Sequence, residues 1–219
     1  MPKTETKDDC SGSQTKIPIR AVVFDYGNVL SQPQTTADAE RLAALCGTEF
    51  SRFSELYWRS RLAYDRADLT AGDYWAAILE AAGRTLSREQ LRELIAIDGH
   101  SWARPNVAAI RWVEQLRKAG LRLAVLSNMP LEIRQYVISH CAWLSCFHHL
   151  TFSCDVGRVK PEAEIYQECL RSLDLPPEEI LFLDDRPENV DAAMGLGIHG
   201  LVFDNTENTR ARASARFRL

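Results

Sequence analysis

The stretch IRAVVFDYGNVLS, residues 19–31, runs from a continuous apolar segment into an aspartate, with a glycine two residues beyond it. An apolar run without polar alternation is typical of a strand covered on both faces, as in a parallel sheet. Such a strand carries Asp25 to its carboxyl end, at the edge of the sheet. The stretch therefore predicts a buried strand that delivers an acid to its tip.

Three further apolar runs end in polar or acidic residues in the same way, and a fourth is a weaker candidate. They are LRLAVLSN at 121–128, EILFLDD at 179–185, GLVFDN at 200–205 and, more weakly, HHLTFSCD at 148–155. Helical patterns lie between the later runs, with apolar residues at helical spacing: Val107, Ile110, Val113 and Leu116, then Ile165, Cys169 and Leu173. This alternation predicts an α/β fold with a doubly wound, Rossmann-like parallel sheet.

In such a sheet the ligand lies outside the carboxyl ends of the strands. The residues predicted to converge there are Asp25, Ser127, Asn128, Asp184 and Asp185. Ser127 and Asn128 precede a helix that is expected to begin near Pro130, so a hydroxyl and main-chain N–H groups could receive an anion. A simple N-cap for Ser127, and a turn followed by a helix start for the acidic pair, are the alternatives.

Residues 34–104 break the rhythm of strands and helices. They contain no strand-like run and are rich in Ala, Leu, Arg and Glu, with the aromatic residues Phe53, Tyr57, Trp58, Tyr64, Tyr74 and Trp75. We expect an α-helical insertion, the cap, at 34–104 and a core made of 17–33 and 105–219. Residues 1–16 are polar and are predicted to be a flexible tail.

The composition narrows the choice of partners and compartment. The chain has 219 residues and a formal net charge of −4, which gives no broad attraction for nucleic acid or anionic membranes. The arginines at 210, 212, 216 and 218 are the exception, and a solvated C-terminal helix or tail explains them. No apolar run is long enough to span a bilayer. Six cysteines without a C-x-x-C pair, and no signal-peptide pattern, predict free thiols and a cytoplasmic location.

Two local patterns suggest other sites and are set aside. HCAWLSCFHHL, residues 140–150, holds two Cys and three His, but its spacing matches no common tetrahedral zinc pattern and its apolar residues are typical of core. GLGIHG, residues 195–200, fits G-x-G-x-x-G but leads into a strand-like run. A dinucleotide fingerprint would follow a strand and open a helix, so we expect a loop.

Four motifs stand in a characteristic order: FDYGN at 24–28, SNMP at 127–130, GRVKPEAEIY at 157–166 and FLDDRPEN at 182–189. In order and spacing they resemble the haloacid dehalogenase-like (HAD) hydrolase superfamily. The resemblance covers residues 17–203, and the helical insertion stands where a C1-type cap would be. The first motif is similar to the D-x-G-N/G-V motif of a branch of sugar-phosphate phosphatases.

The resemblance implies a Mg²⁺-dependent phosphatase that acts on small phosphorylated metabolites. Asp25 would be the nucleophile, forming an aspartyl-phosphate, and Lys160 would neutralise charge on the phosphoryl group. The metal would be held by Asp25, the Gly27 carbonyl and Asp185, since hard oxygen ligands favour Mg²⁺. Asp184 would either support that shell or replace Asp185 in it. The remaining site residues would bind phosphate: Ser127 and Asn128.

Gly27 departs from the pattern of these phosphatases, which commonly carry a proton-donating aspartate at that position. Three hypotheses follow. The enzyme prefers substrates with better leaving groups, such as sugar 1-phosphates. Alternatively, a cap residue donates the proton, with Asp65, Asp68 and His100 as candidates. In the third, catalysis is weakened and the protein binds a phosphorylated metabolite or a partner protein.

A metal-free 2-haloacid dehalogenase is a further alternative. Those enzymes resemble D-x-Y-G-T at the first motif, whereas here Tyr26 is one place early and Asn28 replaces the threonine. The acidic pair at 184 and 185 argues against a metal-free reaction, because uncompensated carboxylates beside a nucleophilic one repel it.

Overall fold

A five-stranded parallel sheet forms the centre of the computed structural model, which describes residues 16–219. Its strands, in spatial order, are β4 (His149–Phe152), β3 (Arg122–Ser127), β2 (Ala21–Phe24), β5 (Ile180–Asp184) and β6 (His199–Val202). All the predicted strands are present, including the weaker candidate, which forms β4. The predicted tail lies outside the described residues except for Lys16, and so does Cys10.

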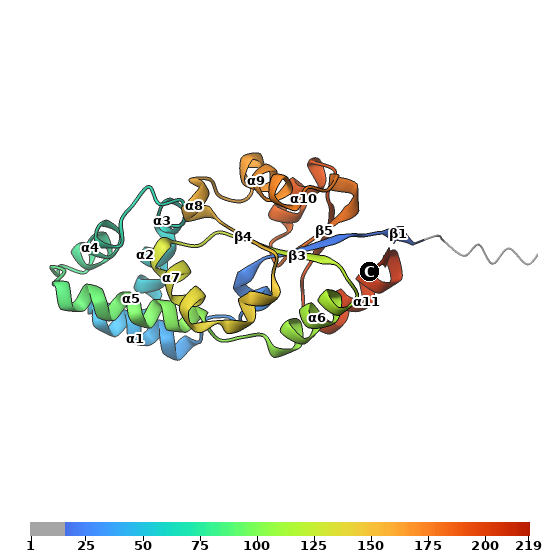
Figure 1. Ribbon diagram of the computed structural model, residues 1–219. Coiled ribbons are helices and arrows are strands. Elements are labelled where there is room, and N and C mark those ends of the chain that lie inside the picture. The colour runs from blue at the N-terminus through green and yellow to red at the C-terminus, as the bar shows by residue number, and fades with distance from the viewer. Residues whose placement is uncertain (1–15) are drawn as a thin grey trace, which may run out of the picture.

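Helices cover both faces of the sheet (Figure 1). One face packs against α6 (Val107–Lys118) and α11 (Thr206–Arg216), the other against α9 (Ala163–Leu173) and α10 (Pro187–Gly195). Along β2, Val22 and Phe24 belong to the first apolar cluster while Ala21 and Val23 belong to the second. A strand buried on both faces must be apolar throughout, so the prediction of a doubly wound α/β fold is confirmed.

The predicted apolar face of α9 is correct, since Ile165, Cys169 and Leu173 are all buried. The prediction for α6 is wrong at its first position: Val107 is 54% exposed. It is the first residue of the helix, directly after the N-cap Asn106, and the buried face is completed by Ala109 and Trp112 instead.

Five helices lie between β2 and α6, beside the sheet (Figure 1). They are α1 (Thr36–Cys46), α2 (Phe50–Arg59), α3 (Arg61–Asp65), α4 (Ala71–Ala81) and α5 (Arg88–Trp102). They enclose an apolar cluster of their own, which contains the aromatic residues Phe53, Tyr57, Tyr64, Tyr74 and Trp75. The sixth aromatic residue of the insertion, Trp58, is 55% exposed. This helical insertion is the cap.

Short contacts join the cap to the core. Where the chain leaves and re-enters the core, Ser31 and Pro105 form an antiparallel bridge, and the Gln32 N–H donates to the Arg104 carbonyl at 2.7 Å. Helix α7 (Leu131–His140), which follows β3, packs against α5. Gly99 permits this approach, because a Cβ there would lie 2.7 Å from Cγ of Tyr136. The cap is thereby held beside the carboxyl ends of the strands.

The remaining elements are short. β1 (Ile17–Pro18) pairs with β7 (Phe217–Arg218), and η1 (Tyr26–Leu30), η2 (Ala142–Cys146), η3 (Pro177–Glu179) and α8 (Ser153–Val156) are turns of helix. The C-terminal arginines at 210, 212 and 216 lie on α11, as predicted, and that at 218 lies in β7. GLGIHG joins the end of α10 to the start of β6, so it precedes a strand as expected. Within residues 16–219 we find no helix both long and apolar enough to cross a membrane.

Candidate active site

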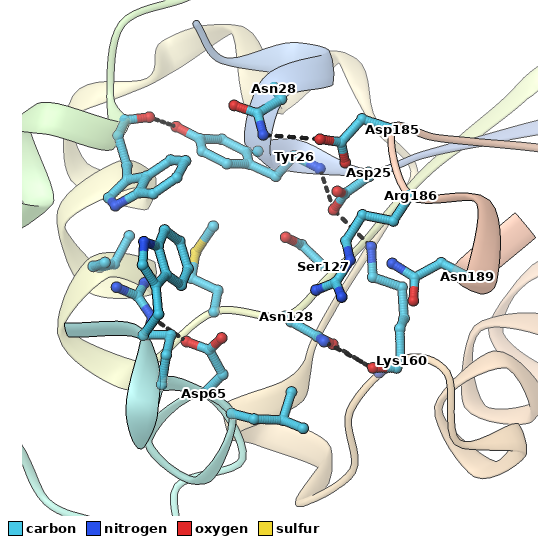
Figure 2. Close-up of a pocket in the computed structure, with 17 residues that line it drawn as sticks. Asp25, Tyr26, Asn28, Asp65, Ser127, Asn128, Lys160, Asp185, Arg186 and Asn189 are labelled. Atoms are coloured by element: carbon cyan, nitrogen blue, oxygen red, sulfur yellow. Dashed lines mark hydrogen bonds and ion pairs between the residues drawn. The ribbon is translucent and has the colours of Figure 1, made fainter. Parts of the chain in front are cut away.

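The carboxyl ends of β2, β3 and β5 open into a cavity of about 340 Å³ between the core and the cap. β2 is the middle strand of the sheet, and the chain passes from it to β3 on one side and later to β5 on the other. The cavity therefore lies at the point where the strand order changes direction, which is where ligands bind in sheets of this kind. The Asp25 N–H donates to the Leu183 carbonyl at 2.8 Å, which ties the end of β2 to β5. Asp25, Ser127 and Lys160 line the cavity (Figure 2).

The turn after β2 orients Asp25 and brings Asn28 to the acidic pair. The Tyr26 N–H donates to Oδ1 of Asp25 at 2.7 Å. Asn28 adopts a left-handed backbone conformation with φ of 59°, which asparagine tolerates better than most residues. Its side-chain amide donates to Oδ2 of Asp185 at 2.8 Å, as Figure 2 shows. Gly27 lies between these residues at the cavity wall.

Lys160 lies between two carboxylates and is 3% exposed. Its Nζ is 2.7 Å from Oδ1 of Asp25 and 2.6 Å from Oδ2 of Asp184. Burial raises the pKa of Asp25 to about 7, although the Lys160 charge opposes that shift. Burial alone would lower the pKa of Lys160, but the two carboxylates raise it above its usual value. The lysine is therefore a fixed positive charge beside Asp25.

The two acids at the end of β5 have different environments. Asp184 is fully buried and accepts hydrogen bonds from Lys160, from the Asn189 side chain at 3.0 and 3.1 Å, and from the Arg186 N–H at 2.9 Å. Asp185 is half-buried and lines the cavity. These contacts favour a supporting role for Asp184 over replacement of Asp185 in the metal shell, because Asp184 is engaged by Lys160 and Asn189 while Asp185 faces the cavity.

Ser127 and Asn128 end β3 beside Lys160. Ser127 is 2% exposed and lines the cavity, and its hydroxyl has no hydrogen-bond partner among residues 16–219. The Asn128 side chain accepts from the Lys160 N–H at 2.8 Å and donates to the Lys160 carbonyl at 3.0 Å. This pair of bonds holds the backbone of Lys160 in place, a role that the sequence does not reveal.

The charges at the core end of the cavity match a divalent cation. One oxygen from each of Asp25, Asp184 and Asp185 can be chosen so that all lie within 4.8 Å of one another, the one such cluster of His, Cys, Asp and Glu that residues 16–219 contain. Carboxylate oxygens are the ligands that Mg²⁺ prefers, so the donor set fits the predicted metal. The histidines and cysteines of 140–150 form no such group within that described part of the chain. Of the apolar residues between them, Leu144 is buried, and Trp143 and Phe147 are partly buried against the core.

The cap end of the cavity is aromatic and contains a second buried ion pair. Nε of Arg61 donates to Oδ1 of Asp65 at 2.7 Å, and both side chains are less than one-tenth exposed (Figure 2). Trp58, Leu62, Trp102, Met129 and Ile133 complete this part of the wall. Of the three cap acids and bases named from the sequence, Asp65 lines the cavity, whereas Asp68 and His100 are exposed and do not.

Residues that the sequence did not single out also contribute to the site. Asn28 and Asn189 hold the acidic pair, and Arg61 holds Asp65. Both asparagines lie inside the motifs at 24–28 and 182–189, so their positions indicated a place in the site although the sequence assigned them no specific role. Arg61 had no such signal, because its contact depends on how the cap helices pack.

The model of the haloacid dehalogenase-like hydrolase family matches residues 19–197. The chain belongs to this family. Among curated relatives, the chain is 26% identical over 197 residues to phosphatase MT3486 of Mycobacterium tuberculosis, covering 88% of this chain and 90% of that protein. It is also 34% identical over 105 residues to mouse acyl-CoA dehydrogenase family member 10, covering 43% of this chain but only 9% of that protein.

Solved structures share the fold. A HAD-family enzyme from Bacteroides thetaiotaomicron, in complex with magnesium and inorganic phosphate, superposes with a TM-score of 0.69 at 20% identity, covering 84% of this chain and 93% of that one. L-2-haloacid dehalogenase from Xanthobacter autotrophicus gives 0.66 at 21% identity, with 89% and 81% covered. The family membership and the phosphatase relative establish a hydrolase with a Rossmann-like core.

Proposed function

We propose that this hydrolase is a Mg²⁺-dependent phosphatase of small phosphorylated metabolites. The observation that carries the proposal is the arrangement of Asp25, with Lys160 at 2.7 Å and Asp185 in the same carboxylate cluster, on the wall of one cavity. A phosphate monoester brings negative charge to a nucleophile that is itself an anion, so cations must gather around both.

The side chains have distinct proposed roles. Asp25 attacks phosphorus and forms an aspartyl-phosphate, which water later hydrolyses. Lys160 neutralises charge on both Asp25 and the phosphoryl group, and Asp184 and Asn128 hold it in place. The Ser127 hydroxyl and the main-chain N–H of Asn128 receive phosphoryl oxygens. Asp25, Asp185 and the Gly27 carbonyl would hold Mg²⁺, which when bound compensates the phosphoryl charge.

The charge of the site favours this reaction over metal-free dehalogenation. With all groups ionised, the carboxylates of Asp25, Asp184 and Asp185 outweigh Lys160 by two charges. A divalent cation balances that excess, whereas a metal-free mechanism leaves it beside the nucleophile. A purely binding protein would have no need for a buried lysine fixed against Asp25 together with this carboxylate group.

Sugar 1-phosphates are the substrate class that we propose. Gly27 supplies no acid, and an anomeric oxygen leaves more readily than that of an ordinary alcohol. The D-x-G-N first motif is similar to that of a branch that hydrolyses sugar phosphates. A cytoplasmic location is proposed from the free cysteines, of which Cys46, Cys141 and Cys169 are buried and Cys146 and Cys154 half-buried.

A phosphate-ester panel measured with and without Mg²⁺ tests the proposal. We expect turnover that requires Mg²⁺, a higher kcat/KM on glucose 1-phosphate than on glucose 6-phosphate, and loss of on the order of 10⁴-fold or more in Asp25→Asn. Turnover that survives Asp25→Asn would contradict the mechanism. Faster hydrolysis of the 6-phosphate would contradict the substrate class, and a panel without any Mg²⁺-dependent turnover would favour the binding role.

A further inference from the structure

Position 27 has no side chain that could donate a proton, and a tryptophan of the cap lies beside it. The backbone of Gly27, with φ −64° and ψ 135°, would accept any residue. A Cβ there would lie 3.5 Å from Cζ3 of Trp102, in van der Waals contact. The indole at the end of α5 therefore stands beside the place where an aspartate side chain would begin. A proton for the leaving group has to come from another part of the cavity wall.

The geometry of phosphoryl transfer indicates which wall. The attacking and leaving oxygens lie roughly in line on opposite sides of phosphorus. With Asp25 as the nucleophile at the core end, the leaving oxygen faces the cap end of the cavity. Figure 2 shows the Asp65 carboxylate across the cavity from Asp25, with Ser127 and Asn128 beside the space between them.

The other ionisable side chains of the wall are committed elsewhere. The Tyr26 hydroxyl donates to the Trp102 carbonyl at 2.9 Å. Lys160 is fixed between two carboxylates, and Asp185 belongs to the carboxylate cluster at the core end. Of the two wall arginines, Arg61 is paired with Asp65 and Asp98, and Arg186 is paired with Glu188. Asp65 is the acid that remains.

Asp65 has one oxygen free for a substrate. Its Oδ1 accepts from Arg61, while its Oδ2 has no hydrogen-bond partner among residues 16–219. The side chain is only 9% exposed, and it lines the cavity. Because the side chain lines the cavity and Oδ1 alone is held by Arg61, a substrate in the cavity can contact Oδ2.

Hydrogen bonds hold Asp65 at a fixed position relative to the phosphate-binding turn. The Ser153 hydroxyl donates to the Asp65 carbonyl at 2.5 Å, and the same hydroxyl accepts from the Met129 N–H at 2.8 Å. Met129 directly follows Asn128. Two hydrogen bonds thus connect the end of α3 to the turn at the end of β3, so the cap acid and the phosphate-binding groups share one rigid frame.

The cluster around Arg61 contains more carboxylates than its cation can balance. Arg61 pairs with Asp65 at 2.7 Å and with Asp98 at 3.8 Å, and Asp98 also accepts from the Tyr57 hydroxyl at 2.7 Å. Burial raises the pKa of both aspartates, while Arg61 opposes the shift in each and the more distant Lys160 opposes it at Asp65. One excess negative charge in a buried cluster favours retention of one proton.

We propose that Asp65 is the general acid and base of the reaction, replacing the aspartate absent at position 27; this inference rests on the proposed phosphatase function. In the first step an Asp25 oxygen bonds to phosphorus, the bond from phosphorus to the leaving oxygen breaks, and that oxygen keeps the electron pair and takes the Asp65 proton. In the second step water attacks phosphorus, the bond to Asp25 breaks, and the Asp65 carboxylate takes a proton from that water. Both aspartates return to their starting states.

The test uses two aryl phosphates of similar size that differ in the basicity of the leaving group. 4-Nitrophenolate is stable as an anion, whereas phenolate, with a pKa of about 10, benefits from protonation. We expect Asp65→Asn to lower kcat/KM on phenyl phosphate by at least about tenfold more than on 4-nitrophenyl phosphate. The ratio kcat/KM reports on departure of the leaving group even where the second step limits kcat.

Asp68→Asn is the matched control, because Asp68 is an exposed cap aspartate outside the cavity; it should leave both rates unchanged. Asparagine mimics a protonated aspartate, so thermal melting should show Asp65→Asn folded and no less stable than the wild type. Equal losses on both substrates, or no loss on either, would overturn the role of Asp65. Absence of Mg²⁺-dependent turnover in the wild type would overturn the proposed phosphatase function instead, and with it this inference.

Discussion

The two ends of the cavity contain the same unit, a buried cation between two buried carboxylates. At the core end, Lys160 lies between Asp25 and Asp184; at the cap end, Arg61 pairs with Asp65 and Asp98. The core end has a further carboxylate facing the cavity, and its oxygens cluster tightly enough for a metal. The cap end has aromatic rings around the guanidinium, with that of Tyr57 5.0 Å away.

This difference shows how each end can balance its charge. The core end exceeds its cation by two negative charges, which a divalent cation would compensate. The cap end exceeds its cation by one, which a proton would compensate. A metal fixes and activates a phosphoryl group, whereas a proton can be given to a leaving oxygen. In the proposed mechanism the charge excess of each end determines its chemical role.

Of the substitutions that distinguish the two ends of the cavity, removal of the core cation should have the largest effect. We expect Lys160→Met to lower kcat/KM by on the order of 10³-fold, because Asp25 and the phosphoryl group lose their fixed positive charge. Steady-state kinetics with saturating Mg²⁺ measures this effect. Lys118→Met, which changes an exposed lysine in the last turn of α6, is the matched control. A loss of less than tenfold would contradict the assignment of Lys160.

Removal of the cap cation should act on stability. Arg61→Met leaves Asp65 and Asp98 buried without a partner, and we expect the free energy of unfolding to fall by about 3–5 kcal/mol. Denaturant unfolding measures it, with the exposed Arg59→Met as control. Mg²⁺ should not restore this loss, because the metal site lies at the other end of the cavity. Recovery of the stability of Arg61→Met by Mg²⁺ would contradict the assignment of separate charge clusters to the two ends of the cavity.

The pH dependence of the free energy of unfolding should also distinguish the two ends of the cavity, with a smaller effect than the two substitutions above. Asp25, with a pKa raised to about 7 from 3.8, keeps a proton that the unfolded chain loses near pH 4. Between about pH 4 and pH 7 the folded state therefore binds more protons than the unfolded chain, and the stability of the metal-free protein falls as pH rises through 7. The raised pKa values of Asp65 and Asp98 act in the same direction.

Mg²⁺ should offset only the part of this pH-dependent loss of stability that comes from the core end of the cavity. We expect Mg²⁺ to raise Tm more at pH 8 than at pH 5, by roughly 2–4 °C for each kcal/mol of differential binding. Thermal melts at both pH values measure the effect, with Asp25→Asn as the variant that reduces this difference, because burial also raises the pKa of Asp185. An equal Mg²⁺-induced shift at the two pH values would contradict the shifted titration of Asp25.

Much of the core end could be predicted from the sequence. The strands are continuous apolar runs because both faces of a parallel sheet are buried, and the parallel order brings their carboxyl ends to one edge. Asp25, Ser127 and Asp185 meet there for that reason. The exposure of Val107 was not predicted, since helical spacing does not show that the first residue of a helix, directly after its N-cap, is exposed. The different environments of Asp184 and Asp185 could not be predicted either, because the two residues are adjacent and of the same type.

The cap end could not be predicted in the same way. Asp65, Asp68 and His100 were equivalent candidates in the sequence, and only the packing of α2, α3 and α5 brings Asp65 to the cavity and leaves the other two in solvent. A helical pattern states which residues share a face, but not which neighbour that face meets. The pairing of Arg61 with acids four and thirty-seven positions away is a tertiary outcome.

The doubly wound sheet and the set of motif residues at its carboxyl edge follow from the order of residues in the chain, because burial on both faces demands continuous apolar strands and the motifs end those strands. Which side chains share a buried cation, and so how much charge each end of the cavity carries, depends on how the folded elements pack together. That charge depends on distances of a few ångströms between residues far apart in the chain, which no local pattern encodes.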